Sequence, residues 1–284
     1  MRQWLIEGKE IGSQYVPAEP RRAPHGTTGT RLGRRPGESL EFEDYRDYQP
    51  GDDLRKLDWS VYARSDSLVV RVFREEVVPH LDIVLDVSAS MAVRSEKHAA
   101  AVMTTGLFAG AADAGGFSTR AWSIGDTCRE IVGSSSYVSG WQLEAFDGRG
   151  DSGDVFVSET PRMQPRGIRV MISDLMFAAD PEVVTTVLSR GSSYASIVQI
   201  LDHDDRTPPQ HGTVKLIDSE TLAPYEVYID DFTRQRYIQR LEQHVRGWEV
   251  ACERRGISFT TLAAEDVLDS NLDDLVSRRI LRAP

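Results

Sequence analysis

The sequence is poor in cysteine and lacks any long apolar run. Its 284 residues include two cysteines, Cys128 and Cys252, which lie far apart and form no C-x-x-C pair. Disulfide frameworks and cysteine zinc sites need more thiols at closer spacing, so reduced thiols and a cytoplasmic location are expected. No apolar stretch approaches the roughly 20 residues of a membrane helix. Because charge follows the first residues in place of a signal core, membrane insertion is not expected.

The sequence is also poor in positive charge and in catalytic motifs. Lys and Arg number 33 against 44 Asp and Glu, a net charge of -11, which argues against nucleic acid as a partner. Serine hydrolase, zinc protease and phosphate-loop motifs are missing, and we expect no enzyme. The remaining catalytic alternative is a Mg²⁺-dependent hydrolase or phosphatase that uses Asp86. However, the haloacid dehalogenase type needs a second carboxylate where Ser88 stands.

Composition divides the chain into three parts. Residues 1–37 contain four prolines, several glycines and a basic run, and predict a flexible amino-terminal arm. Residues 38–80 carry short alternating segments around the Pro50–Asp53 turn and a strand at 68–73, which predicts a small β-rich lobe. Residues 81–284 form the third part, the main domain.

Within residues 81–284, short apolar segments alternate with helical ones. Strands are expected at 81–86, 117–124, 168–172, 194–201 and 257–262, a hairpin at 214–217 and 225–229, and helices at 95–114, 181–190, 232–255 and 267–279. The helix at 232–255 is expected to bury one stripe: Tyr237, Leu241, His244, Trp248 and Cys252. This alternation predicts an α/β fold with a doubly wound, mostly parallel sheet of the Rossmann type.

Two of the expected strands end in aspartates, Asp86 and Asp174. Open parallel sheets bind ligands beyond the carboxyl ends of their strands, near the point where strand order reverses. After the first strand, Asp86, Ser88 and Ser90 alternate, so that one carboxylate and two hydroxyls can converge on Mg²⁺ or Mn²⁺. The structural alternative is a helix start at which Ser88 or Ser90 caps free amides.

These residues resemble two known patterns. Asp86-x-Ser88-x-Ser90, followed by Met91, resembles the metal-ion-dependent adhesion site of von Willebrand factor A domains, in which Asp174 corresponds to the distant aspartate. Upstream, a long pattern resembles the signature of the bacterial DUF58 family: Glu41-Phe42-x-x-Tyr45-Arg46-x-Tyr48-x-Pro50-Gly51-Asp52-Asp53-x-Arg55-x-x-Asp58-Trp59-x-x-x-Ala63-Arg64. The resemblance extends from about Gly33 to the carboxyl terminus.

The resemblance implies a von Willebrand factor A-like domain that acts as a non-enzymatic, chaperone-like adaptor. Ser88 and Ser90 would hold the cation directly, Asp86 and Asp174 would hold it through water, and one position would stay open for a partner's carboxylate. DUF58 proteins are often encoded beside MoxR-type AAA+ ATPases. A MoxR-type ATPase and a client protein are therefore the partners that the resemblance implies, in complex assembly, maturation or stress response.

One segment departs from the family pattern. Family members usually carry Gly-Gly-Thr-Asp between the two acidic strands, whereas this chain has Gly150-Asp151-Ser152-Gly153-Asp154. Ser152 offers the hydroxyl that the threonine would supply, while Asp151 or Asp154 would either bind a cation directly or repel each other without one. If the altered site holds no metal, the alternative is a metal-free scaffold that recognises its partner through residues 38–74.

Two further groups of polar residues are interpreted as structural. Asp52, Asp53, Arg55, Asp58 and Arg64 are expected to form a hydrogen-bonded brace between the small lobe and the main sheet, with Trp59 in the core. His203, Asp204, Asp205 and His211 cluster in one polar segment and are expected to be solvated.

Overall fold

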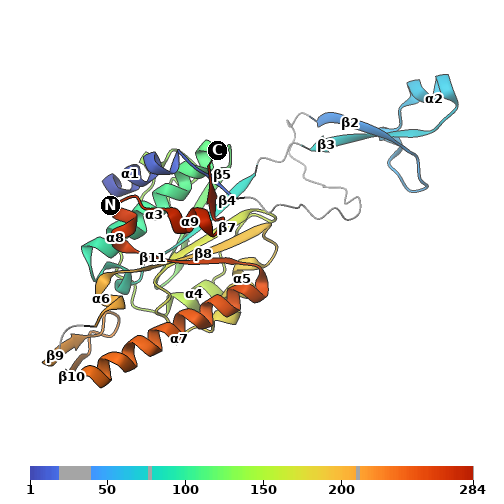
Figure 1. The fold of residues 1–284 in the computed structure, drawn as a ribbon. Coiled ribbons are helices and arrows are strands. Elements are labelled where there is room, and N and C mark those ends of the chain that lie inside the picture. The colour runs from blue at the N-terminus through green and yellow to red at the C-terminus, as the bar shows by residue number, and fades with distance from the viewer. Residues whose placement is uncertain (19–39, 76–78, 209–211, 284) are drawn as a thin grey trace. The chain divides into compact units, whose positions relative to one another are not determined.

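The computed structural model describes residues 1–18, 40–75, 79–208 and 212–283. The chain divides into two compact units, one formed by Met1–Arg21 and Pro79–Pro284 and the other by Arg22–Val78. The larger unit is an α/β structure around a six-stranded sheet (Figure 1). Among the described residues, no helix is both long and apolar enough to cross a membrane.

The central sheet has the order β11-β8-β7-β4-β5-β6. Its strands are β4 (His80–Asp86), β5 (Ser118–Ile124), β6 (Cys128–Glu130), β7 (Ile168–Ser173), β8 (Tyr194–Leu201) and β11 (Ser258–Ala263). All neighbours are parallel except β5 and β6. Strand order reverses between β4 and β7, which confirms the predicted doubly wound sheet and places its switch point between the two acidic strand ends.

Both faces of this sheet are covered by helices. In β4, Leu81, Ile83 and Leu85 pack into one core and Val84 packs into the other, because successive side chains alternate. The first face carries α3 (Ser95–Ala114), α8 (Ala264–Leu268) and α9 (Asp273–Ser277), and the second carries α4 (Ser152–Ser158), α5 (Pro181–Ser189) and α7 (Asp231–Arg255). Burial on both faces explains why the inner strands β4, β7 and β8 are rich in apolar residues.

The amino-terminal residues form a helix, α1 (Arg2–Gly12), that packs on α3 (Figure 1). Its contact depends on small residues, because a Cβ on Gly8 would lie 2.0 Å from the Met103 carbonyl oxygen and one on Gly106 2.1 Å from that of Leu5. Leu5 is buried. Since α1 covers it, α3 is buried on nearly all sides, as its uniformly apolar surface requires.

The predicted arm is therefore wrong for its first part. Beyond α1, β1 (Val16–Pro17) pairs with β12 (Leu281–Arg282), so the two ends of the chain meet in one small sheet. The prolines and basic residues that suggested an arm lie after residue 16 and masked the helical pattern before them. Residues 19–37 of the predicted arm lie outside the described residues.

Two carboxyl-terminal predictions need correction. The helix expected at 267–279 is divided between α8 and α9, because Asp269–Asn271 favours a turn and Ser270 adopts a φ of 59°. In α7 the predicted stripe is fully buried only at Trp248 and Cys252, whereas Tyr237 is exposed. The amino-terminal half of α7 extends beyond the sheet together with the hairpin.

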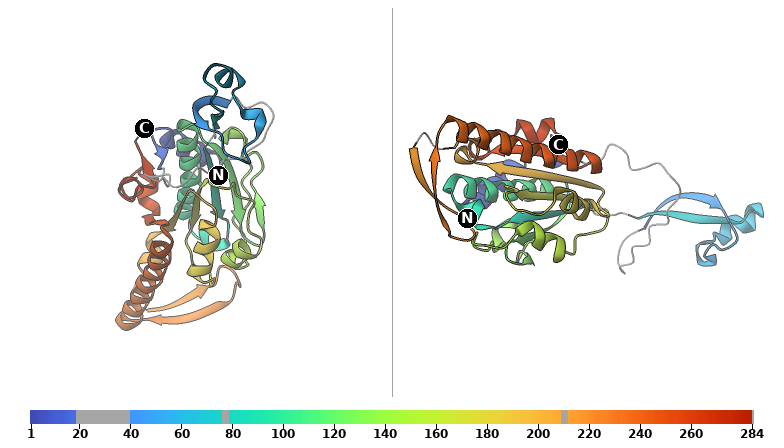
Figure 2. Two further views of the ribbon diagram at one scale, coloured as in Figure 1. Left: turned by 90° about the vertical axis from the view of Figure 1, so that its right-hand side faces the viewer. Right: turned by 90° about the horizontal axis from the view of Figure 1, so that it is seen from below.

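The predicted hairpin is confirmed as β9 (Gly212–Ile217) and β10 (Pro224–Ile229). It follows the short helix α6 (His203–Arg206) after the carboxyl end of β8. Figure 2 shows this hairpin extending across that end of the sheet from the start of α7. Within the described parts of the chain, its two strands pair only with each other.

The smaller unit consists of β2 (Leu40–Asp47), a 3-10 turn (Leu54–Lys56), α2 (Trp59–Ser65) and β3 (Val69–Glu75), with β2 and β3 antiparallel. This confirms the β-rich lobe. Its expected brace takes a different form. Asp52 accepts two bonds from the guanidinium of Arg46, at 2.8 and 2.7 Å, and not from that of Arg55. Asp53 accepts the backbone N–H of Arg55 at 3.0 Å and caps the 3-10 turn.

Asp58 is the other fixed point of the smaller unit. Its buried carboxylate caps α2 and accepts a bond from the Tyr45 hydroxyl at 2.9 Å. Arg64 donates to a carbonyl of its own helix. The expectation that Trp59 is core is wrong, since it is 60% exposed at the first position of α2. The hydrogen bonds named here all join residues of the smaller unit.

Candidate metal centre

Asp86 lies at the end of β4, at the switch point of the sheet, and is fully buried. Its Oδ1 accepts the backbone N–H of Ser88 at 2.9 Å. Its Oδ2 accepts two hydroxyl groups, from Ser152 at 3.0 Å and from Ser173 at 2.6 Å. The carboxylate thus joins the loop after β4, the start of α4 and the end of β7 in one polar cluster.

The two serines of the Asp86 loop face each other. The hydroxyls of Ser88 and Ser90 lie 3.1 Å apart, with Ser88 buried and Ser90 partly buried. Ser88 is positioned to cap the 3-10 turn Ala89–Ala92, yet its side chain makes no cap hydrogen bond. The capping interpretation therefore fails for Ser88, and this hydroxyl is directed into the cluster with that of Ser90.

Ser152 is the first residue of α4 and is buried beside Asp86. Asp151 holds it there, because one carboxylate oxygen of Asp151 caps α4 through the Asp154 N–H at 2.8 Å and the other accepts the Ala178 N–H at 2.7 Å. Both Asp151 oxygens are thus occupied in local structure. The segment that departs from the family pattern therefore places a hydroxyl, that of Ser152, beside Asp86.

Asp174 follows β7 and is buried, but its carboxylate is engaged elsewhere. Its Oδ2 lies 2.8 Å from the ammonium of Lys97, and its Oδ1 accepts the Met176 N–H at 3.0 Å. The same ammonium lies 2.9 Å from Asp205 in α6. Lys97 and Asp174 are 2% and 1% exposed, so this ion pair is shielded from water.

Three residues of this cluster were not predicted from the sequence in these roles: Lys97, Ser173 and Asp205. Lys97 stands in the first turn of an Ala-rich helix, where a lysine is usually solvated. Asp205 was expected to be solvated, whereas the structure places it against Lys97. Of these three residues, only Ser173 could have been recognised as a site residue from the sequence, because it directly precedes Asp174 at the end of an apolar strand.

The electrostatics of the cluster follow from burial. Burial raises the pKa of Asp86 to about 6, and the negative charge of Asp174 adds to this effect. Burial opposes the charged form of Lys97, but Asp174 and Asp205 more than offset it and raise the pKa of this ammonium. Lys97 lies between two carboxylates, those of Asp174 and Asp205, and the charge of Asp174 also acts on the buried Asp86, so carboxylates outnumber the ammonium here.

This donor set fits a small divalent cation. Among the described residues, no group of three or more His, Cys, Asp or Glu side chains is placed to hold a metal, so binding here depends on hydroxyls. Ser88, Ser90 and Ser152 would supply hard oxygen donors, with waters in the remaining positions, and Asp86 would supply negative charge. A divalent ion would also offset part of this excess negative charge.

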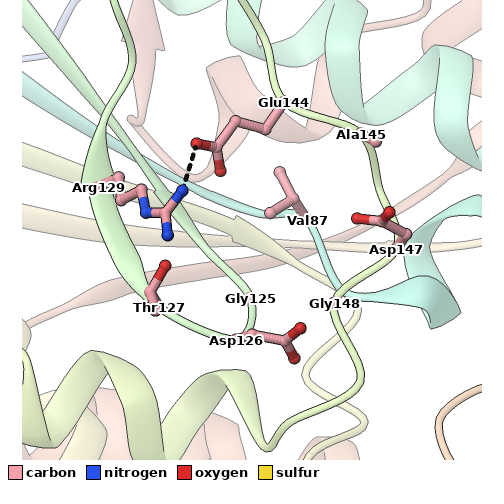
Figure 3. A pocket seen from close by; sticks show the side chains of 9 residues that line it. All are labelled: Val87, Gly125, Asp126, Thr127, Arg129, Glu144, Ala145, Asp147 and Gly148. Atoms are coloured by element: carbon pink, nitrogen blue, oxygen red, sulfur yellow. Dashed lines mark ion pairs between the residues drawn. The ribbon is translucent and has the colours of Figure 1, made fainter.

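A pocket of about 250 Å³ adjoins the Asp86 loop (Figure 3). Val87 lines it, and Arg129 and Glu144 form an ion pair across it at 3.7 Å. At its edge, Asp126 accepts the N–H groups of Arg149 and Gly150, each at 2.7 Å. These two bonds lower the pKa of Asp126 and fix the loop that leads to Ser152.

Residues 44–246 match the family described as "Protein of unknown function DUF58". The chain belongs to the DUF58 family. Uncharacterized proteins of Mycobacterium tuberculosis and Mycobacterium bovis are similar, each 28% identical over 234 residues, which is 76% of this chain and 72% of the relative. The predicted family membership is thus confirmed.

Three solved structures are also similar to this DUF58 chain, each at low sequence identity. BatB from Bacteroides thetaiotaomicron has a TM-score of 0.34 at 11% identity, over 71% of this chain and 98% of its own. A von Willebrand factor type A protein from Catenulispora acidiphila has a TM-score of 0.37 at 11% identity, over 75% of this chain and 45% of its own. An aerotolerance-related membrane protein from Bacteroides fragilis has a TM-score of 0.36 at 12% identity, over 71% of this chain and 98% of its own. The fold class assigned above follows from the sheet topology itself.

Proposed function

We propose that this DUF58 protein is a protein-interaction adaptor whose Asp86 cluster binds Mg²⁺ or Mn²⁺ and presents it to a partner's carboxylate. The observation that carries the proposal is the convergence of the Ser88, Ser90 and Ser152 hydroxyls beside the buried Asp86 at the switch point of the sheet. Ser88 and Ser90 hold the cation directly, and Ser152 takes the third position. Because Lys97 engages Asp174, this carboxylate contributes charge more than coordination.

A protein partner is supported by the surface beside the cluster. The hairpin β9–β10 exposes large apolar side chains: Leu216, Ile217, Leu222, Tyr225 and Tyr228. Apolar surface of this kind next to a polar centre is typical of protein-binding sites. Burial raises the pKa of Glu220 in the hairpin turn, and the charges of Asp218, Asp151 and Asp174 raise it further, so the turn lies within the electrostatic reach of the cluster. A partner bound at the cation would therefore also meet the hairpin.

The partner that we propose is a MoxR-type AAA+ ATPase, with a client protein as the second contact. This identity comes from family resemblance, whereas the chemistry requires only a surface with an exposed carboxylate and apolar neighbours. One charge-assisted bond between the cation and the partner's carboxylate would fix the position of the partner, and the apolar contacts with the hairpin would supply most of the affinity.

The first test is calorimetric titration of Mg²⁺ and Mn²⁺ into the wild type, Asp86→Asn, Ser152→Ala and Ser158→Ala. Ser158 lies on the same helix as Ser152, but its hydroxyl bonds to helix carbonyls, so it is the matched control. We expect saturable binding in the wild type and Ser158→Ala, and loss of at least tenfold in affinity in the other two. Equal affinity in all four proteins would refute the site.

The second test measures binding of a purified MoxR-type ATPase with Mg²⁺ or with EDTA. We expect capture that needs the cation and is lost in Asp86→Asn while that variant stays folded. Capture that is independent of both the cation and Asp86 would instead support the metal-free scaffold.

A further inference from the structure

The Lys97 side chain is the most deeply buried cation near the candidate metal centre. It extends from the first turn of α3 and contacts Asp174 at 2.8 Å and Asp205 at 2.9 Å. A buried lysine is costly unless its charge is paired, and here two carboxylates from separate elements pair with it.

The Lys97 pair is directly connected to the Asp86 cluster. Ser173, which precedes Asp174, donates to Asp86 at 2.6 Å, so the ammonium and the Asp86 carboxylate are linked through two consecutive residues of one strand end. The negative charge of Asp174 acts on Asp86, and Lys97 neutralises that charge, so Lys97 acts through Asp174 on any ion held by Ser88 and Ser152. Charges interact strongly under these conditions, because little water screens them.

We infer that Lys97 determines the charge selectivity of the metal centre: it lowers the negative charge of the centre by one and so favours a divalent over a trivalent cation. Without Lys97 the carboxylates of Asp174 and Asp205 would lose their shared ammonium, and the centre would carry one more negative charge. The preference for a trivalent ion would then rise, because each added site charge interacts more strongly with a charge of three than with a charge of two. This inference rests on the proposed cation site and concerns its selectivity.

The test compares the dissociation constants of Mn²⁺ and Tb³⁺, measured by calorimetry, and uses their ratio as the readout. Lys97→Met removes the ammonium, and Asp205→Asn removes one of its carboxylates. The double variant Lys97→Met/Asp205→Asn restores the residual charge of the wild type. Lys97→Arg keeps the charge in another shape. Lys9→Met removes a partly buried lysine whose partner Asp113 is exposed, and is the control for a general loss of positive charge.

We expect Lys97→Met to shift the ratio toward Tb³⁺ by about tenfold or more, and Asp205→Asn to shift it in the opposite direction. The double variant and Lys97→Arg should return to within about threefold of the wild type, and Lys9→Met should match it. If Lys97→Met does not fold, Asp205→Asn and Lys97→Arg still give two points of the charge series.

Two results would overturn the inference. One is an unchanged ratio in every folded variant. The other is a double variant that keeps the ratio of Lys97→Met, which would assign Lys97 a packing role. Both leave the proposed cation site in place if the wild type binds Mn²⁺. A wild type that binds neither ion would overturn the proposed function and this inference together, which separates the two failures.

Discussion

At the scale of single residues, two opposing effects act on the pKa of Asp86. Its carboxylate accepts three hydrogen bonds, which stabilise the charged form, yet it is fully buried and close to Asp174. Burial and the neighbouring charge prevail and raise its pKa to about 6. Without a cation, the folded protein therefore holds a proton here more tightly than the unfolded chain does.

This shift predicts a defined pH dependence of stability. Because the folded pKa is raised, the contribution of Asp86 is fully present below the unfolded pKa of about 4 and is lost as the pH rises through about 6. In EDTA, the free energy of unfolding of the wild type relative to Asp86→Asn should fall by roughly 3 kcal/mol between pH 4 and 7. Mg²⁺ at pH 7 should restore it in the wild type only. A difference that is constant with pH in urea denaturation would contradict this.

Glycines at the α1–α3 contact give a second prediction for single residues. A Cβ on Gly106 would lie 2.1 Å from the backbone oxygen of Leu5, so neither helix can adapt by a side-chain movement. Gly106→Ala should lower the free energy of unfolding by about 1–3 kcal/mol, the usual cost of overpacking. Gly247→Ala in α7 is the matched control, because nothing lies within 4 Å of its added Cβ.

The Gly247→Ala control should be neutral or stabilising, since alanine favours a helix interior. Denaturant unfolding of both variants measures the difference. Equal stability of Gly106→Ala and the wild type would mean that α1 does not approach α3 as closely as described.

At the scale of elements, the β9–β10 hairpin is the part least connected to the sheet. An isolated two-stranded hairpin is marginally stable in water, and this one exposes most of its side chains. Its ends are adjacent, because Gly212 pairs with Ile229. The chain can therefore be closed across its base without disturbing β8 or α7.

Replacement of residues 213–228 by two or three glycines should consequently leave the fold intact. The midpoint of thermal unfolding should change by only a few degrees, whereas the hairpin amides of the wild type should exchange with deuterium much faster than those of β4 and β7. Cation affinity should persist, and capture of a protein partner should fall. Global unfolding of the shortened chain would show that the hairpin is part of the core.

At the scale of the whole molecule, the larger unit is assembled from both ends of the chain. The segment Met1–Arg21 belongs to the same unit as Pro79–Pro284, through α1 on α3 and β1 beside β12. Residues 22–78 form the other unit between them. The larger unit is therefore not one continuous stretch of the chain, because the smaller unit is inserted into it in the sequence.

We predict that removing residues 1–21 and replacing residues 22–78 have unequal effects on the stability of the α/β unit. Removal of residues 1–21 uncovers the apolar surface of α3 and should lower the unfolding midpoint markedly, with increased binding of an apolar dye. Replacement of residues 22–78 by a flexible linker should preserve the α/β unit, as judged by circular dichroism and resistance to proteolysis. The opposite order of stabilities would contradict the division into these two units.

The sequence by itself determined the five parallel strands of the central sheet and three of the helices that cover it, α3, α5 and α7. Apolar runs buried on both faces, such as 81–86 and 168–172, have a period and length that local patterning reveals, and in a doubly wound sheet their polar ends must meet. The sequence also shows that the segment Gly150–Asp154 offers a hydroxyl, that of Ser152, because this follows from the residue type alone.

Tertiary structure alone decided the remaining features. Lys97 and Asp205 lie far apart in the sequence and meet only because α3 and α6 both begin at the carboxyl edge of the sheet. The α1–α3 contact depends on glycines that locally suggest a flexible chain but permit close backbone approach once two helices face each other. Local sequence encodes the preferences of each segment, whereas burial and charge pairing arise only when distant segments are brought together.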